Sequence, residues 1–169
     1  MPEMRRCLVD NFRVGQGFDI HRFSQDPEYP LVLGGVRFGG PGLVGHSDAD
    51  PVAHACIDAL LGAAGSGDIG EWFPDTDDSL AGADSLVLLA KVAADLGADG
   101  WEVCNVDCTV ILDEPRVAPH REEMQHLLSE VIGAPVNVRG RRAEGLGSVG
   151  RGEGVACLAV ALILSLIHI

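Results

Sequence analysis

Two short clusters of histidine and aspartate residues offer the side chains that bind divalent metals. Asp19 and His21 stand two residues apart, so on a strand both side chains point to the same face. A second cluster, residues 46–50 (HSDAD), precedes His54. One carboxylate and two imidazoles supply three protein ligands and leave a fourth position open, as a catalytic zinc-type centre requires. The spacing therefore predicts a metal site at Asp19, His21 and His54.

A helix over residues 51–64 is expected to carry His54. Pro51 suits the first turn of a helix, and Asp50 just before it is a plausible N-cap. His54, Ile57 and Leu61 share one face of that helix, which predicts that His54 points inward. A second role for Asp50 stays open, because a metal-bound histidine usually needs a partner that orients its ring.

The remaining segments predict a mixture of strands and helices. We expect strands at residues 12–18, 31–38, 101–112 and 136–139, and helices at 83–96, 119–132 and from 154 to about 163. Glycines 34 and 35 interrupt the second strand and indicate a bulge or a close approach. Residues 65–80 predict a loop that can move around a ligand. The pattern predicts one domain of the α/β (α+β-like) class, with a mixed β-sheet covered by helices.

The composition excludes several classes of partner. A chain of 169 residues with 47% hydrophobic residues is long and apolar enough for one folded domain. Its net charge of −13 argues against nucleic acid and anionic membrane surfaces as partners. Binding of phosphate would therefore need a local basic cluster, for which the candidates are Arg139, Arg141, Arg142 and Arg151. The apolar run at residues 155–167 is too short to span a membrane and predicts a core helix.

Cysteines and chain ends bear on the cellular compartment and on the domain boundaries. Five cysteines without Cys-x-x-Cys spacing predict buried thiols in a reducing compartment. Without a recognisable signal peptide, the expected location is the cytoplasm, or the plastid stroma in a eukaryote. Residues 13–163 are expected to form the domain, residues 1–12 an N-terminal extension, and residues 164–169 a non-native tail that replaces the natural C-terminus.

An ordered set of motifs resembles one enzyme family. After the metal-ligand candidates come DIG at residues 68–70, FPDTD at 73–77, NVD at 105–107, PH at 119–120, ExLG at 144–147 and GRGEG at 150–154. The set resembles the 2-C-methyl-D-erythritol 2,4-cyclodiphosphate synthases across nearly the whole chain. The resemblance implies a homotrimeric, metal-dependent phosphorus–oxygen lyase of non-mevalonate isoprenoid (terpenoid) biosynthesis. Its substrate would be 4-diphosphocytidyl-2-C-methyl-D-erythritol 2-phosphate, and its products the cyclic diphosphate and CMP.

The resemblance also implies which residues hold metal ions and phosphate. Asp19, His21 and His54 would bind a zinc-type divalent ion (Zn, or else Mn or Co), and Glu144 a second ion, Mg or Mn, between the two phosphates. His46 and Ser47 would contact the methylerythritol phosphate, and His46 would take part in catalysis.

The rest of the substrate would be held by three further segments, again by resemblance. Asp68, Ile69 and Gly70 would hold the ribose. The loop that closes on the methylerythritol would consist of Phe73, Pro74, Asp75, Thr76 and Asp77. The cytosine pocket would be lined largely by backbone groups of Leu112, Asp113, Glu114, Pro115, Arg116, Val117 and Ala118.

The chain departs from the family at its phosphate-binding segment. The family usually has threonines before the position of Glu144, where this chain has Arg141, Arg142 and Ala143. Arg142 stands at the position credited with stabilising the transition state. Arg142 could bind phosphate bidentately and take over that role, or the two guanidinium groups could fill a site shaped for hydroxyls and weaken catalysis. A sequence error is a third explanation.

Arg151 and Glu153 lie, by resemblance, near the threefold axis of the trimer. Arg151 is expected to open the last helix and anchor a phosphate there. Ser148 takes the place of an apolar residue that faces the central cavity, and it makes that cavity more polar. Some family members hold an isoprenoid diphosphate in this cavity.

Two alternative functions remain open at this point. The first is a non-catalytic homologue that binds a metal and a cytidine nucleotide or an isoprenoid diphosphate without turnover. The second, from the metal site alone, is a general metal-dependent phosphohydrolase. The expected partners are a small-molecule cytidine diphosphate substrate and two further copies of the chain.

Overall fold

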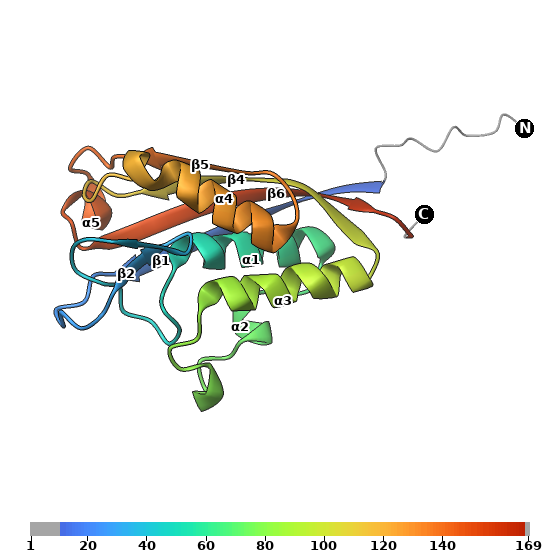
Figure 1. Cartoon of the computed structure of the whole chain (residues 1–169), viewed down its shortest axis with the longest axis horizontal. Helices are drawn as coiled ribbons and strands as arrows, with labels where there is room; N and C mark the ends of the chain where they lie inside the picture. Colours follow the sequence, from blue (N-terminus) through green and yellow to red (C-terminus); the bar gives the residue numbers. More distant parts are fainter. Residues whose placement is uncertain (1–10, 168–169) are drawn as a thin grey trace, which may run out of the picture.

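Four strands form one mixed sheet in the computed structural model, which describes residues 11–167 (Figure 1). The strands are β1 (Phe12–Arg22), β6 (Gly154–Ser165), β4 (Trp101–Ile111) and β5 (Val136–Arg141), and they lie side by side in that order. The β1–β6 and β6–β4 pairs are antiparallel, and the β4–β5 pair is parallel. The predicted mixed sheet with covering helices is confirmed.

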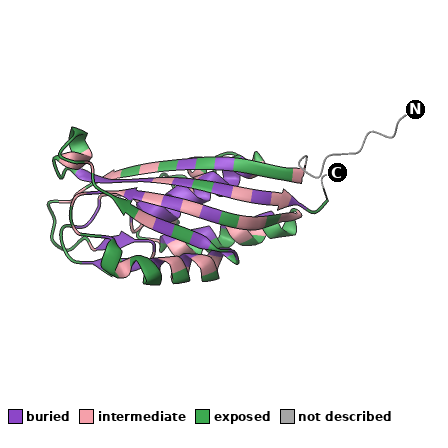
Figure 2. Cartoon of the chain, turned by 90° about the horizontal axis from the view of Figure 1, so that it is seen from above, coloured by how far each residue is buried: buried purple, intermediate pink, exposed green. Residues whose placement is uncertain are grey.

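Three long helices gather on one face of this sheet. Helix α1 (Pro51–Ala64) packs on β1 and β6, helix α4 (Arg121–Ile132) packs beside β5, and helix α3 (Ser85–Ala98) contacts both helices. Figure 2 looks onto the opposite face of the sheet, which is not covered by any element of residues 11–167. No described helix is long and apolar enough to cross a membrane.

Short elements complete the described chain. They are β2 (Leu31–Leu33), β3 (Val36–Phe38), α2 (Ile69–Trp72) and α5 (Gly147–Gly150), with single 3₁₀ turns at Asp78–Leu80 and Ala118–His120. The strand expected at residues 31–38 is a hairpin, since Gly34 and Gly35 have φ of 58° and 77° and form its turn. Positive φ at both central residues is typical of a type I′ hairpin.

The helix expected from residue 154 is wrong. Residues 154–165 form β6, which pairs along its length with β1 on one side and β4 on the other. The segment has no polar alternation because its outward side chains, including Leu158 and Val160, are apolar as well. Arg151 consequently does not open a long helix: it follows the four-residue helix α5 and precedes β6.

Asp50 starts α1 and holds the hairpin at the same time. Its buried carboxylate accepts hydrogen bonds from the backbone N–H groups of Val52 and Ala53, at 2.9 and 3.2 Å. It also accepts from the N–H groups of Gly34 and Gly35, at 2.9 and 2.7 Å. The predicted N-cap is confirmed, and the same side chain ties the β2–β3 turn to the start of the helix.

Helix α1 lies directly against the backbone of β1. A Cβ atom at Gly15 would stand 2.0 Å from the carbonyl oxygen of Ala59, and one at Gly17 would stand 1.9 Å from that of Ala55. Real side-chain atoms do not approach so closely, so both positions require glycine. This contact brings the first turns of α1 over the end of β1, where Asp19 and His21 follow.

Sheet pairing continues into the expected non-native tail. Leu164 pairs with Phe12, and Ser165 pairs with Trp101, so both residues belong to β6. That residues 164–169 form a non-native tail stays a prediction. Residues 1–10, 168 and 169 lie outside the described part of the chain.

Three of the five cysteines are buried in the core, as expected. Cys56, Cys108 and Cys157 are fully covered, and the sulfurs of Cys56 and Cys108 lie 3.4 Å apart. Cys104 is partly exposed, and Cys7 precedes the described residues.

Substitution of Gly17 by Ala should destabilise the fold by about 1–3 kcal/mol, because the added methyl group pushes α1 away from β1. Gly97, near the end of α3, has open space around its Cβ position and offers a matched control. Gly97→Ala should stabilise by about 0.5–1 kcal/mol through helix propensity. Urea unfolding of both variants measures the two effects. Equal effects of the two substitutions would contradict the close contact.

Candidate metal centre and flanking cavities

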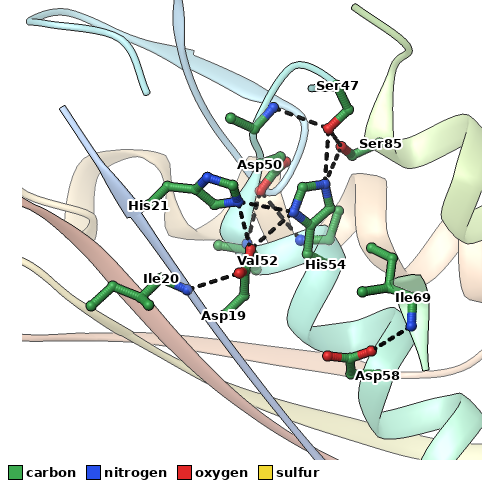
Figure 3. Close-up of polar contacts among 12 residues, drawn as sticks. Asp19, Ile20, His21, Ser47, Asp50, Val52, His54, Asp58, Ile69 and Ser85 are labelled. Atoms are coloured by element: carbon green, nitrogen blue, oxygen red, sulfur yellow. Dashed lines mark hydrogen bonds and ion pairs between the residues drawn. The ribbon is translucent and has the colours of Figure 1, made fainter. Parts of the chain in front are cut away.

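Asp19, His21 and His54 converge at one end of the sheet (Figure 3). The first two side chains come from β1, and the third comes from the first turn of α1. Asp19 Oδ2 lies 3.0 Å from His21 Nε2 and 2.9 Å from His54 Nδ1, and the two nitrogens are 3.3 Å apart. Three ligand atoms therefore form a small triangle, as the sequence predicted.

The size of this triangle fits a tetrahedral divalent ion. Zinc–nitrogen bonds of about 2.0–2.1 Å place neighbouring ligand atoms of a tetrahedron about 3.3–3.4 Å apart. The observed separations of 2.9–3.3 Å are close to this value. Three protein ligands would also leave a fourth position of such an ion free for another ligand.

The other nitrogen of each imidazole has a hydrogen-bond partner. His21 Nδ1 lies 2.8 Å from the carbonyl oxygen of Val44, and His54 Nε2 lies 2.9 Å from Ser85 Oγ and 3.0 Å from Ser47 Oγ. The residue that orients His54 is thus a serine rather than Asp50. No local pattern in the sequence indicated Ser85, which lies 31 residues from His54.

Asp19 and His21 shift each other's protonation. Burial raises the pKa of Asp19, but the hydrogen bonds and charges of His21 and His54 outweigh it and hold that pKa well below the usual range. Burial lowers the pKa of His21, but the hydrogen bond and charge of Asp19 raise it above the ordinary value of 6.5. A metal ion would therefore have to displace a firmly held proton.

A cavity of about 560 Å³ adjoins the triad. It brings together most of the residues that the resemblance assigned to methylerythritol and ribose. These lining residues are Asp19, His21, His46, Ser47, Ile69, Gly70, Phe73, Pro74, Asp75 and Thr76. Leu80 and Leu88 also line the cavity and had not been expected there.

Asp68 and Asp77 flank this cavity as caps of short helical turns. Asp68 accepts a hydrogen bond from the N–H of Glu71, and Asp77 accepts from the N–H of Ser79, each at 2.9 Å. The carbonyl oxygen of Asp77 lies 3.0 Å from His46 Nε2, which joins the 73–77 segment to the histidine cluster.

Asp58 is a further acid near the site that had not been singled out. It lies four residues after His54 on the same side of α1, and it accepts a hydrogen bond from the N–H of Ile69 at 2.9 Å. Burial raises its pKa. Its helical spacing from His54 was a usable signal in the sequence.

A second cavity, of about 320 Å³, is lined by five arginines. These are Arg116, Arg121, Arg139, Arg141 and Arg142, and they are joined by Leu112, Asp113, Val117, Ala118 and Gly140. Most of the residues expected around the cytosine and the phosphates therefore share one cavity. Arg142 Nε lies 3.5 Å from Asp113 Oδ1, and Arg121 was not among the predicted residues.

Six expected site residues lie elsewhere. Glu114 and Arg151 line a third cavity of about 350 Å³, with Asp113 common to it and the arginine cavity. Pro115, Ala143, Glu144 and Ser148 line none of these three cavities. Within the described chain, Glu144 is not a member of the Asp19–His21–His54 group.

The triad and the arginine cavity belong to opposite edges of the sheet. Asp19 and His21 lie on the edge strand β1, whereas Arg139 and Arg141 lie on the other edge strand, β5. Three strand spacings separate these edges, which corresponds to roughly 14 Å. A single copy of the chain thus carries the triad and the arginine cavity at two separate places.

Comparison with known proteins shows the family to which the sequence and fold are similar. The sequence profile of the YgbB family matches residues 12–164. The chain is 49% identical over 156 residues to the 2-C-methyl-D-erythritol 2,4-cyclodiphosphate synthase of Edwardsiella ictaluri, covering 90% of this chain and 98% of that protein. It is also similar to the solved structure of a Plasmodium falciparum IspF CDP complex, with a TM-score of 0.80, 31% identity and coverage of 92% and 97%.

Longer proteins also contain this domain. The chain is 51% identical over 163 residues to the bifunctional enzyme IspD/IspF of an Anaeromyxobacter species. The match covers 95% of this chain but only 42% of the relative, so the chain spans about two fifths of that bifunctional protein's length.

Replacement of Asp19 by Asn should lower the pKa of His21, because the charge and hydrogen bond that raise it are lost. In the metal-free parent, the stability gained by charging His21 is full below pH 6.5 and is lost as the pH rises through the raised pKa. The Asp19→Asn variant should not show this decrease in stability as the pH rises. NMR titration of the His21 ring and urea unfolding across this range measure both effects. Asp95→Asn, which removes the partner of the exposed Lys91, is the control and should leave the His21 titration unchanged.

Proposed function

The chain belongs to the YgbB family, and on that premise we propose that it is a 2-C-methyl-D-erythritol 2,4-cyclodiphosphate synthase. The observation that carries the proposal is the convergence of Asp19, His21 and His54 beside the cavity lined by His46 and the 73–76 segment. The substrate proposed for it is 4-diphosphocytidyl-2-C-methyl-D-erythritol 2-phosphate.

The proposed reaction is an internal phosphoryl transfer. An oxygen of the substrate's 2-phosphate attacks the β-phosphorus of the diphosphate, and the bond from that phosphorus to the bridging oxygen breaks. CMP leaves with the bonding electrons, and the cyclic diphosphate remains. Because the nucleophile is part of the substrate, the protein needs no nucleophilic side chain and must chiefly align two anionic groups.

Asp19, His21 and His54 are proposed to hold a zinc-type ion, which when bound supplies positive charge and Lewis acidity at the phosphates. His46 and Ser47 line the same cavity and are proposed to hold the methylerythritol phosphate. Glu144 is exposed and is proposed to bind a second ion, Mg or Mn, because oxygen ligands suit such hard cations.

The arginines are proposed to bind the remaining charge of the diphosphate, with the cytosine held beside residues 112–118. The side chain of Arg142 is 60% exposed and its nearest carboxylate, Asp113, is 3.5 Å away, so the guanidinium group is free to turn toward a phosphate. A planar guanidinium can bind two phosphate oxygens at once and can offset charge that develops in the transition state.

A homotrimer is proposed because one copy of the chain holds the two halves of the site at opposite edges of the sheet. Two further copies, arranged in a ring, could set the β1 edge of one chain beside the β5 edge of the next. The open face of the sheet also exposes neighbouring apolar side chains on β1 and β6, with Val14 at 68%, Phe18 at 52% and Val160 at 44%. Monomeric proteins rarely expose a contiguous apolar surface of this kind.

Purified protein with zinc and magnesium should convert the authentic substrate to the cyclic diphosphate and CMP, as followed by phosphorus NMR. Arg142→Ala should lower kcat about 100-fold, in the range found when one charge-stabilising donor is removed. Arg37→Ala, on the hairpin strand β3, removes an exposed arginine elsewhere and should leave kcat unchanged.

The Arg142→Thr variant separates the two explanations of this residue. Lower activity than the parent supports a phosphate-binding arginine, whereas higher activity shows that the guanidinium group obstructs the site. A parent protein that binds metal but shows no turnover in this assay would overturn the proposed enzyme.

Sedimentation velocity should give a species of three chains. Val160→Glu places a charge on the open face of β6 and should shift the protein toward single chains that remain folded, because the side chain is already partly exposed. Val87→Glu on α3 is the matched control, since Val87 is 63% exposed away from the sheet, and it should leave the trimer intact. A single-chain parent would contradict the trimer.

A further inference from the structure

Ser85 lies where the metal triad meets the helix α3. It is fully buried at the first position of that helix, and its hydroxyl is 2.9 Å from His54 Nε2 (Figure 3). The same oxygen is 2.5 Å from Asp48 Oδ1, and the backbone N–H of Ser85 donates to Asp48 Oδ2 at 3.3 Å. Asp48, Ser85 and His54 thus form a chain of hydrogen bonds that ends at a metal-ligand candidate.

The direction of these hydrogen bonds follows from the single proton of a hydroxyl. A carboxylate can only accept, so the Ser85 O–H donates to Asp48, and toward His54 the serine oxygen can only accept. Ser47 fits the same scheme. Its oxygen lies 3.0 Å from His54 Nε2 and accepts from the N–H of Ala49 at 3.2 Å. Its own proton can be donated to Ser85 Oγ, 3.3 Å away, which leaves the Ser47 oxygen as a second acceptor beside His54 Nε2.

The consequence for His54 is a defined position of its ring proton. An acceptor beside Nε2 requires the proton on Nε2, which leaves the lone pair on Nδ1, the nitrogen that faces Asp19 and His21. The opposite tautomer would also be stabilised locally, because Asp19 Oδ2 lies 2.9 Å from Nδ1 and would accept its proton. A proton on Nδ1 would take up the lone pair through which this nitrogen would bind a metal ion.

His21 meets the same requirement in another way. Its Nδ1 donates to the carbonyl oxygen of Val44, a group that can never donate, so in the neutral ring the lone pair is on Nε2. Ser85 could act as donor or acceptor, and only Asp48 makes it a fixed acceptor.

We propose that Asp48 and Ser85 are positioning residues that hold His54 in the Nε2-protonated tautomer and thereby keep Nδ1 available for the metal. The inference rests on the metal site proposed above. Neither residue needs to touch the ion or the substrate, and the pair acts through the ring of His54.

The test compares Ser85→Ala, Ser85→Thr and Asp48→Asn with the parent in two measurements. Competition with a chromophoric chelator gives the affinity for Zn²⁺, and long-range nitrogen NMR of the metal-free protein gives the tautomer of His54. Ser85→Ala should weaken Zn²⁺ binding about 10- to 100-fold and raise the share of the Nδ1-protonated ring. Ser85→Thr keeps the hydroxyl, so its Zn²⁺ affinity and His54 tautomer should remain near those of the parent. Asp48→Asn should give values between those of the parent and those of Ser85→Ala.

Ser129→Ala is the matched control for general loss of stability. Ser129 is half-buried and its hydroxyl accepts from the N–H of Val136 at 3.0 Å, far from the triad in the fold. Its removal should leave both the affinity and the tautomer unchanged.

The outcomes separate the two proposals. A parent that binds no Zn²⁺ would overturn the metal site itself. A parent that binds, with unchanged affinity and tautomer in Ser85→Ala, would overturn the positioning role alone. If Ser85→Ala does not fold, the tautomer of His54 in Asp48→Asn decides, because a tautomer identical to the parent's would again contradict the role.

Discussion

The close contact between helix α1 and strand β1 determines the geometry of the whole site. Two glycines on β1 let the helix backbone approach until carbonyl oxygens of Ala55 and Ala59 occupy the space where side chains would otherwise stand. The distance from Asp19 to His54 is then a consequence of backbone packing rather than of flexible side chains. A metal site built on a strand and a helix in direct contact keeps its ligands in place before any ion arrives.

Local patterns predicted the elements that carry the metal ligands, and their failures have physical reasons. The helix over residues 51–64 was predictable because Asp50, Pro51 and the spacing of its apolar residues all agree. Strand β6 was mistaken for a helix because an inner strand with apolar side chains on both faces has no two-residue alternation. Ser85 could not be predicted, since its role depends on a contact between residues far apart in the chain. Asp58, by contrast, lay within reach of a simple helical-spacing argument.

The excess negative charge of the chain and the proposed anionic substrate are reconciled by the distribution of the arginines. Five of them line one cavity around a single aspartate, at the edge of the sheet opposite the triad. Positive charge is thus concentrated where phosphates would lie, while the rest of the surface can remain acidic. The order β1-β6-β4-β5 makes this separation unavoidable within one chain, and the sequence could not reveal it, because strand order is a property of the tertiary fold.

The pairing of Phe12 with Leu164 has a topological consequence. Both ends of the described chain leave the sheet side by side (Figure 1), at the end remote from the metal ligands. Asp19 lies seven residues farther along β1, or roughly 23 Å away at the usual rise per residue. A domain joined to either end would therefore leave access to the metal ligands open. The same proximity makes the fold a good candidate for circular permutation, in which a short linker joins the two ends and new termini are opened in an exposed loop.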